Sequence, residues 1–346
     1  VCPYGAINKL ERPCARSGGM DANKSDEHGR AEIDYDKCVS CGQCLVSCPF
    51  GAIVDKGQIF QTIHAMKSGE EVIAAVAPAF VGQFGVKATP DKVKTALKEL
   101  GFSDVIEVAI GADLCTVEEA EDFLNKVPSQ QPFMATSCCP AWSVMAKKCF
   151  PDFKPYISMA LTPMVLTGRL IKQEKPNAKV VFIGPCAAKK LEASRKSVRS
   201  DIDFVLTFEE VMGMFEAKNI DIEAISGGDD SFVEGSGDGR GFAVSGGVAN
   251  AVKQVILSKH PEMQVNIDSA EGLKNCKTML MLAKAGKRNG YLLEGMACPG
   301  GCVAGAGTLQ NVTKSSALVK NYTTKANKQH AHESEYIDHL ERLTKD

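Results

Sequence analysis

From about residue 71, short continuous apolar runs alternate with stretches of helical periodicity. Val72–Ala77 is apolar throughout and ends at a proline, which is typical of a buried strand. Thr89 and Pro90 then supply an N-cap and an N1 proline for a helix that stops before Gly101. Because strands alternate with helices, we predict an α/β fold with mostly parallel sheets flanked by helices.

The same pattern continues along the chain and divides this region in two. It predicts strands at 104–110, 133–136, 179–183, 203–207 and 291–293, and helices that begin at Thr116, at Pro140, after Cys186, after 207 and after Gly247. We expect one domain over 71–346, with α/β lobes at about 71–175 and 176–310 and a helical tail over 311–346. Ligands of such sheets gather beyond the carboxyl ends of strands, so cysteines from both lobes could converge.

The amino-terminal part, 1–60, has a different pattern, dominated by cysteines. Cys38, Cys41, Cys44 and Cys48-Pro49 form C-x2-C-x2-C-x3-C-P, the bacterial ferredoxin run. Its first three cysteines bind one 4Fe-4S cluster and the fourth reaches a neighbouring one, whereas zinc patterns do not have this final Cys-Pro. We therefore predict a small α+β ferredoxin-like domain with one or two accessory 4Fe-4S clusters.

An internal repeat adds two candidate ligands to this domain. Cys2-Pro-Tyr-Gly-Ala-Ile repeats the sequence that begins at Cys48, so Cys2 should complete the cluster held by Cys38, Cys41 and Cys44. Cys14 is then left to assist Cys48, but the residue four positions later, Gly18, is not a cysteine. Either residues before Val1 supply further ligands, or the second site is empty and Cys14 is a free thiol. The chain begins without a methionine or a signal peptide, which predicts an earlier native start.

Composition narrows the class of protein. The 346 residues include 40 basic and 42 acidic ones, with a net charge of −2, so nothing indicates the basic face that nucleic-acid binding needs. We find no apolar run of about 18 residues and so predict no membrane span. The 14 cysteines, without a secretory segment, favour metal ligation in a reducing compartment and hence a cytoplasmic protein.

Four cysteines outside the ferredoxin run carry the remaining chemistry. They are Cys139 in T-S-C-C-P-A-W, Cys186 in G-P-C-A-A-K-K-L-E, and Cys298 and Cys302 in E-G-M-A-C-P-G-G-C. Four thiolates can hold one iron–sulfur cluster. From about Ala74 to Gly307 the chain resembles the iron-only (FeFe) hydrogenases, and these three motifs are similar to that family's active-site signature.

The resemblance implies a reaction and a cofactor. The four cysteines would ligate the 4Fe-4S part of an H-cluster, and Cys302 would also bridge to a diiron part whose CO, cyanide and dithiolate ligands come from maturation machinery. The reaction is the reversible reduction of protons to H2 with electrons from ferredoxin. Lys189 and Glu192 belong to the implied cofactor site, with Lys189 as a hydrogen-bond donor to cyanide, and Ala77, Pro78, Met296 and Phe242 as its walls. The alternative is a solvated helix lysine and ordinary core packing.

The resemblance also implies a proton route. Cys138 is the free thiol that would face the diiron part, and in the family the proton then passes through water, a glutamate, a serine and a second acid. Glu119 and Asp122 match the two acids. Thr116 and Glu119 also fit a capping box, which is a purely structural explanation. Met159 aligns with the serine, so water, Ser158 or Thr162 would have to substitute, or another route exists.

Two departures separate this chain from prototypical members. Gly184 replaces the methionine that usually precedes the proline of the second motif, which should loosen the cavity or let another side chain fill it. The short segment before Glu294 and Gly305-Ala-Gly307 resemble the divergent group B branch. Two alternatives stay open: an H2- or redox-sensing relative with low turnover, and an Fe–S assembly factor relative. The hydrogenase-like assembly factors tend to lose diiron-site residues of the kind that this chain keeps.

Overall fold

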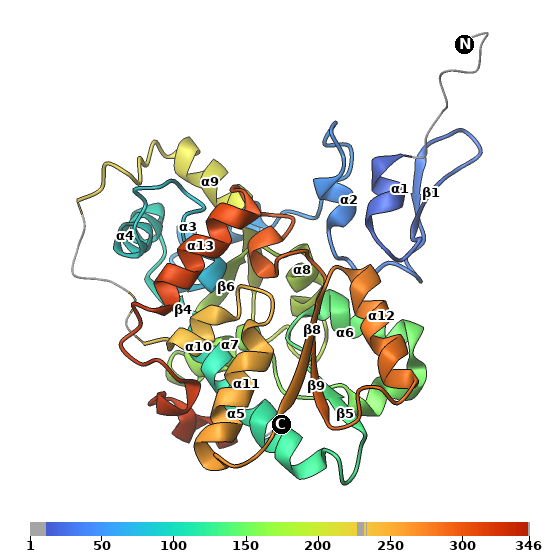
Figure 1. Cartoon of the computed structure of the whole chain (residues 1–346). Coiled ribbons are helices and arrows are strands. Elements are labelled where there is room, and N and C mark those ends of the chain that lie inside the picture. The colour runs from blue at the N-terminus through green and yellow to red at the C-terminus, as the bar shows by residue number, and fades with distance from the viewer. Residues whose placement is uncertain (1–11, 227–231, 233, 345–346) are drawn as a thin grey trace.

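Two parallel sheets form the centre of the molecule in the computed structural model, which describes residues 12–226, 232 and 234–344 (Figure 1). The first sheet has the order β4-β3-β6-β7, and the second has the order β5-β9-β8. The strands are β3 (Val72–Val76), β4 (Asp104–Glu107), β5 (Phe133–Ala135), β6 (Lys179–Gly184), β7 (Phe204–Thr207), β8 (Asn266–Glu271) and β9 (Tyr291–Met296). All strand pairs of these two sheets are parallel, which confirms the predicted α/β class.

Helices cover both sheets and bury the central strands. They are α3 (Ile59–Lys67), α4 (Pro90–Leu100), α5 (Ala109–Lys126), α6 (Pro140–Cys149), α7 (Pro163–Glu174), α8 (Ala187–Ala193), α9 (Phe208–Ala217), α10 (Gly237–Gly241), α11 (Gly247–Lys259), α12 (Leu273–Lys284), α13 (Val312–Thr323) and α14 (Leu340–Thr344). Every residue of β3 is buried, which explains its unbroken apolar sequence, since a central parallel strand is covered on both faces. No described helix is long and apolar enough to cross a bilayer.

Local signals gave some boundaries correctly and others wrongly. Helix α4 has the predicted bounds, because Pro90 and Gly101 mark its two ends. The helix predicted to begin at Thr116 instead begins at Ala109, and Thr116 lies inside α5, where its Oγ1 donates to the Ala112 carbonyl at 2.7 Å. The capping box with Glu119 is therefore wrong. The pattern did not predict β8, because an edge strand that is only partly buried has no clear apolar run.

The predicted division into consecutive lobes needs correction, because the chain interleaves the two sheets. The segment 71–175 contributes β3 and β4 to the first sheet but β5 to the second. The segment 176–310 likewise contributes β6 and β7 to the first sheet and β8 and β9 to the second. Each sheet thus needs both halves of the sequence, and the site between them is formed only when the whole region folds.

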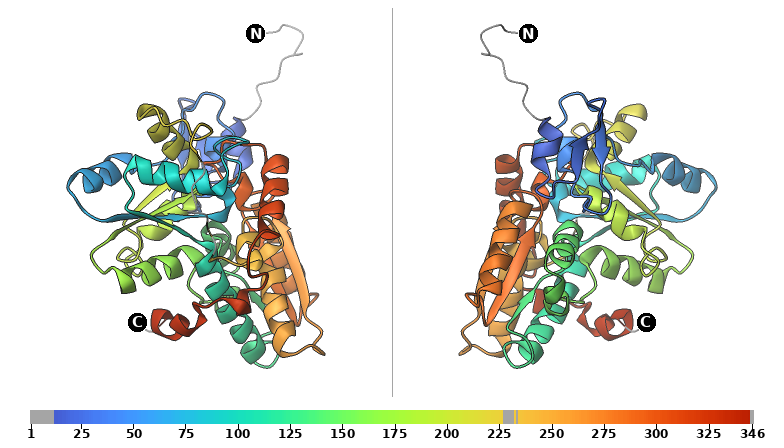
Figure 2. Two further views of the ribbon diagram at one scale, coloured as in Figure 1. Left: turned by 90° about the vertical axis from the view of Figure 1, so that its left-hand side faces the viewer. Right: turned by 90° about the vertical axis from the view of Figure 1, so that its right-hand side faces the viewer.

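A small amino-terminal module packs on this α/β region. Its described elements are α1 (Pro13–Ser17), the hairpin of β1 (Asn23–Ser25) with β2 (Ala31–Ile33), and α2 (Gln43–Val46). The module and the carboxyl end of the chain lie at opposite ends of the molecule (Figures 1 and 2). Gly42, at φ 76°, marks the contact, because a Cβ there would lie 2.5 Å from the Cβ of Ala306. A side chain at Gly42 would therefore push the module away from the loop after Cys302.

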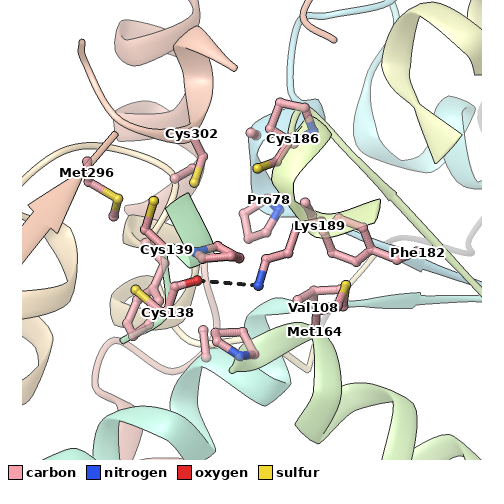
Figure 3. A pocket seen from close by; sticks show the side chains of 18 residues that line it. Pro78, Val108, Cys138, Cys139, Met164, Phe182, Cys186, Lys189, Met296 and Cys302 are labelled. Atoms are coloured by element: carbon pink, nitrogen blue, oxygen red, sulfur yellow. Dashed lines mark hydrogen bonds between the residues drawn. The ribbon is translucent and has the colours of Figure 1, made fainter. Parts of the chain in front are cut away.

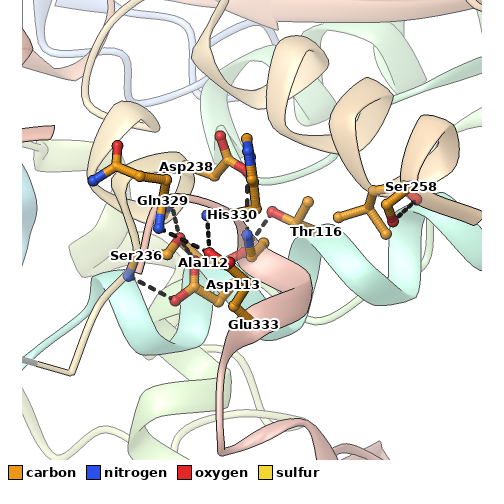
Figure 4. A network of polar contacts seen from close by, with 12 residues as sticks. Ala112, Asp113, Thr116, Ser236, Asp238, Ser258, Gln329, His330 and Glu333 are labelled. Carbon is orange, nitrogen blue, oxygen red and sulfur yellow. Dashed lines mark hydrogen bonds and ion pairs between the residues drawn. The ribbon is translucent and has the colours of Figure 1, made fainter. Parts of the chain in front are cut away.

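The carboxyl-terminal tail packs on α5 and α10. Val319 and Tyr322 of α13 are buried, and Asp238 of α10 accepts from the Ala331 backbone at 3.1 Å and contacts the His330 ring at 3.2 Å (Figure 4). Asp113 of α5 accepts from the Ser236 backbone at 2.9 Å, and burial raises its pKa to about 8. The tail therefore contacts α10, whose N-cap residue Ser236 in turn hydrogen-bonds to the helix that carries Glu119.

Candidate functional site

The four dispersed cysteines lie at the carboxyl ends of strands from both sheets. Cys139 follows β5 and precedes α6, Cys186 follows β6 and precedes α8, and Cys298 and Cys302 follow β9. β5 and β9 are neighbours in one sheet, and β6 is a central strand of the other. The parallel topology thus brings together Cys139 and Cys302, which are 163 positions apart in the sequence.

A cavity of about 80 Å³ lies between these strand ends. Figure 3 shows Cys139, Cys186 and Cys302 pointing toward one another at this cavity, with Cys138 and Lys189 beside them. The predicted apolar residues line it as well: Ala77, Pro78, Phe242 and Met296. Cys298 is not in the lining, but it lies near the other three sulfurs, and the Gln43 side chain donates to its Sγ at 3.9 Å.

The donor set fits an iron–sulfur cluster. Burial raises the pKa of Cys186 to about 11 and raises the pKa values of Cys139, Cys298 and Cys302. Four buried thiols are poor acids until a metal binds their thiolates. Among the described residues no three His, Cys, Asp or Glu side chains could hold a single metal ion. In a 4Fe-4S cluster each of the four cysteines binds a different iron, so four thiolates from separate strand ends can share one cluster.

Lys189 is a buried cation held beside the cavity. Its ammonium donates to the Glu192 carboxylate at 2.7 Å and to the Cys138 carbonyl at 3.3 Å. Glu192 does not line the cavity; it also accepts from the Thr162 hydroxyl at 2.7 Å. Burial would lower the pKa of Lys189, but the Glu192 carboxylate raises it overall. Lys189 is thus a fixed charged donor rather than the solvated lysine of the alternative interpretation.

The wall at Gly184 is closed by a residue that the motifs did not identify. A Cβ at Gly184 would lie 2.5 Å from the Phe182 ring, and Phe182 lines the cavity. Of the two outcomes expected for this glycine, the structure has the second, in which another side chain fills the space. Phe182 could have been found only from the strand alternation of β6, since residues i and i+2 share a face.

Cys138 and Glu119 form a buried acidic pair next to this cavity. Cys138 is 9% exposed, and burial raises its pKa well above the ordinary thiol value, so the sulfur keeps its proton. Glu119 is fully buried, and burial raises its pKa to about 8. Its Oε1 accepts from the Ser137 backbone at 3.3 Å, whereas Oε2 has no hydrogen-bond partner among the described residues.

The serine next to Glu119 is Ser158 and not its neighbour in sequence. Burial raises the pKa of Glu119, but the Ser158 side chain lies close enough to lower it and is 4% exposed, whereas Met159 is 75% exposed. Thr162, the other possible substitute, donates to Glu192 instead. Asp122 is closer to the surface of α5 and pairs with Lys126 at 2.7 Å. Ser158, and not Met159, is therefore the side chain of this segment that lies beside Glu119.

The ferredoxin run lies within reach of the four-cysteine site. Beyond the effect of burial, Cys41 lies close enough to Cys139 for that thiolate to raise its pKa, and Cys41 in turn raises the pKa of Cys298. Cys38, Cys41 and Cys44 line a second cavity of about 400 Å³, together with Cys14. Cys48 lies outside this cavity, and Cys2 lies outside the described residues.

Comparisons with known proteins agree with this geometry. The family model described as iron only hydrogenase large subunit, C-terminal domain, matches residues 70–306, and a 4Fe-4S binding domain matches residues 30–53. The NADP-reducing hydrogenase subunit HndD of Solidesulfovibrio fructosivorans is 29% identical over 326 residues, 78% of this chain and 55% of that protein. The chain therefore spans about half the length of this relative. The periplasmic Fe hydrogenase large subunit of Nitratidesulfovibrio vulgaris is 31% identical, covering 80% of this chain and 85% of that one.

Two further comparisons bear on the fold and on an alternative function. A structure of apo FeFe-hydrogenase HydA1 from Chlamydomonas reinhardtii matches with a TM-score of 0.70 at 22% identity, covering 84% of this chain and 95% of that chain, which shows the shared fold. The cytosolic iron-sulfur assembly component 3 of Bos taurus is 24% identical, covering 81% of this chain and 72% of that protein.

Proposed function

Because the chain belongs to the iron-only hydrogenase large-subunit family, we propose that it interconverts protons and H2 at the cavity between the two sheets. The observation that carries this proposal is that Cys139, Cys186 and Cys302 line one cavity together with the buried thiol Cys138, with Cys298 near the same sulfurs. When bound, an H-cluster with its CO, cyanide and dithiolate ligands would supply the chemistry of H2 formation and cleavage. The chain's own residues would hold it, exclude water and move protons.

Each side of the cavity has a distinct role in this proposal. Cys139, Cys186, Cys298 and Cys302 would hold the 4Fe-4S part, with Cys302 bridging to the diiron part. Lys189, fixed by Glu192, would donate a hydrogen bond to a cyanide ligand. Ala77, Pro78, Phe182, Met296 and Phe242 would keep bulk water out. The strong apolar character of this wall supports a cofactor that needs enclosure more than it needs protein ligands.

Protons and electrons would arrive from different sides. Cys138 would exchange a proton with Glu119, and Ser158 and Asp122 would connect Glu119 to the surface near Lys126. Electrons would come from a ferredoxin-like carrier through the accessory cluster, because Cys41 lies beside Cys139 and Cys298. All described cysteines are free thiols, which supports a reducing compartment such as the cytoplasm, where the diiron maturation machinery would act.

The decisive experiment loads the protein with the diiron cofactor and assays H2 with a low-potential dye. We expect H2 evolution together with infrared bands of bound CO and cyanide. The matched control is Cys302→Ala, which should show neither the bands nor activity. Wild-type protein that binds iron but shows no bands and no H2 would overturn the proposal.

A second candidate is a relative that senses H2 or handles Fe–S clusters. The similarity to the assembly component supports it, since that relative matches 81% of this chain. The same experiment separates the candidates. Bands with very slow turnover would favour sensing, and 4Fe-4S clusters without diiron bands would favour assembly.

Ser158→Ala should lower H2 turnover about tenfold, which corresponds to about 1.4 kcal/mol in the barrier. Alanine removes the hydroxyl that lies beside Glu119 and that also accepts from the Ala160 backbone at 3.1 Å. Met159→Ser is the matched control and should leave turnover within about twofold, because the Met159 side chain points to solvent. A faster Met159→Ser enzyme would show that our placement of the relay serine is wrong.

A further inference from the structure

Four cysteines converge on the amino-terminal cavity, and one of them lies outside the ferredoxin motif. Cys14 of α1 lines the cavity of about 400 Å³ together with Cys38, Cys41 and Cys44. Cys14 is 7% exposed, so its thiol faces the interior of the module rather than solvent. The 4Fe-4S binding match covers residues 30–53 and does not include it.

The fourth cysteine of the motif is placed differently. Cys48 lines another cavity, whose described lining contains no second cysteine. The Ala52 backbone donates to the Cys48 Sγ at 3.3 Å, and Cys48 is not in the lining of the cavity that the other three cysteines share. The described residues therefore offer Cys48 no set of ligands for a cluster of its own.

We propose that Cys14 is the fourth protein ligand of the accessory 4Fe-4S cluster, with Cys38, Cys41 and Cys44 as the other three. This replaces the expectation that Cys2 completes this cluster by the crossed pattern of two-cluster ferredoxins. This inference rests on the proposed function and deepens it, because the accessory cluster would deliver electrons to the proposed site of H2 formation. A cubane cluster needs four cysteines around one space, and the described chain provides them here.

The placement also gives the cluster a defined neighbour. Cys41 lines the amino-terminal cavity and lies beside Cys139 and Cys298, which belong to the four-cysteine site between the two sheets. Gln43, between Cys41 and Cys44, donates to the Cys298 Sγ. Gly42 packs on Ala306 and Ala187, so α2 and its ligands are held against the loop after Cys302. Cys14 thus completes a cluster directly next to the proposed active site.

The test uses the full chain produced without the diiron cofactor, so that its outcome does not depend on H2 turnover. Iron is counted, and the dithionite-reduced protein is examined by electron paramagnetic resonance. Cys14→Ala should lower bound iron by about four atoms per chain and remove one reduced-cluster signal. Cys48→Ala is the matched control in the same module and should keep both. Cys2→Ala should keep them as well.

Opposite results overturn the proposal. If Cys14→Ala keeps the wild-type iron content and spectrum, or if Cys2→Ala loses the cluster, Cys14 is not the ligand. Cys14→Ser guards against a folding defect, since it preserves the size of the side chain. We expect it to retain the cluster with a shifted reduction potential, and an unchanged potential would contradict ligation by Cys14.

Discussion

Cys138→Ala should lower H2 turnover about 100- to 10,000-fold while the four-cysteine site still binds its cluster. Cys138 is the thiol at the cavity that is not a predicted cluster ligand, and alanine at this position has no S–H group to donate a proton. A positioned proton donor contributes this range of rate, because its loss forces the proton to come from a less ordered source.

The measurement compares H2 evolution with infrared bands and iron content in the same preparation. Bands and iron should match the wild type, so that the defect is assigned to proton transfer and not to assembly. Cys115→Ala is the matched control, because it removes another buried thiol that does not line the cavity. Turnover of Cys138→Ala within about tenfold of wild type would show that protons use another route.

The cysteine motifs were predictable because ligation is a local chemical requirement. Cys139, Cys186 and Cys298 each follow a strand, and parallel strands bring their carboxyl ends to a common edge. The sequence therefore indicated both the ligand type and the convergence. It did not indicate the sheet to which each strand belongs, because strand order depends on long-range pairing that no local pattern records.

Residues that act through packing were harder to identify. An alignment of motifs placed Met159 in the relay, but the backbone turns Ser158 inward and leaves Met159 exposed. In an extended segment, a shift of one residue moves a side chain to the opposite face. A short motif does not fix the alignment to within one residue. Phe182 was missed for a similar reason, since its role follows from the missing side chain at Gly184. Cys14 could not be assigned because no spacing rule links it to the ferredoxin run.

The local structural role that the sequence suggests for Glu119 differs from the environment that the structure shows. The sequence offered a helix cap as its structural role, but the helix begins two turns earlier and the carboxyl group is buried. A buried carboxylate with one oxygen that accepts no hydrogen bond among the described residues is costly, and Glu119 reduces that cost by keeping its proton. Burial thus prepares a carboxylic acid with a pKa of about 8 next to Cys138.

Glu119→Gln should lower H2 turnover about 100-fold or more, because the amide keeps the Ser137 contact but cannot carry a proton. Glu121→Gln is the matched control on the same helix. Glu121 pairs with Lys259 at the surface, and its substitution should leave turnover unchanged. Retained activity in Glu119→Gln would remove Glu119 from the proton route.

The same variant makes an independent prediction about stability. Glu119 has a pKa of about 8 in the folded protein and an ordinary value of 4.5 when unfolded, so between these values the folded state binds a proton that the unfolded state lacks. The free energy of unfolding therefore falls as pH rises through this window. Glutamine does not titrate, so Glu119→Gln should gain stability relative to wild type from pH 5 to about pH 8. Burial also raises the pKa of Asp113 to about 8 and that of Glu294 to about 7. Both proteins should therefore still lose some free energy of unfolding as the pH rises. Denaturant unfolding at several pH values measures the difference, and parallel curves for the two proteins would show that Glu119 is ionised in the folded state.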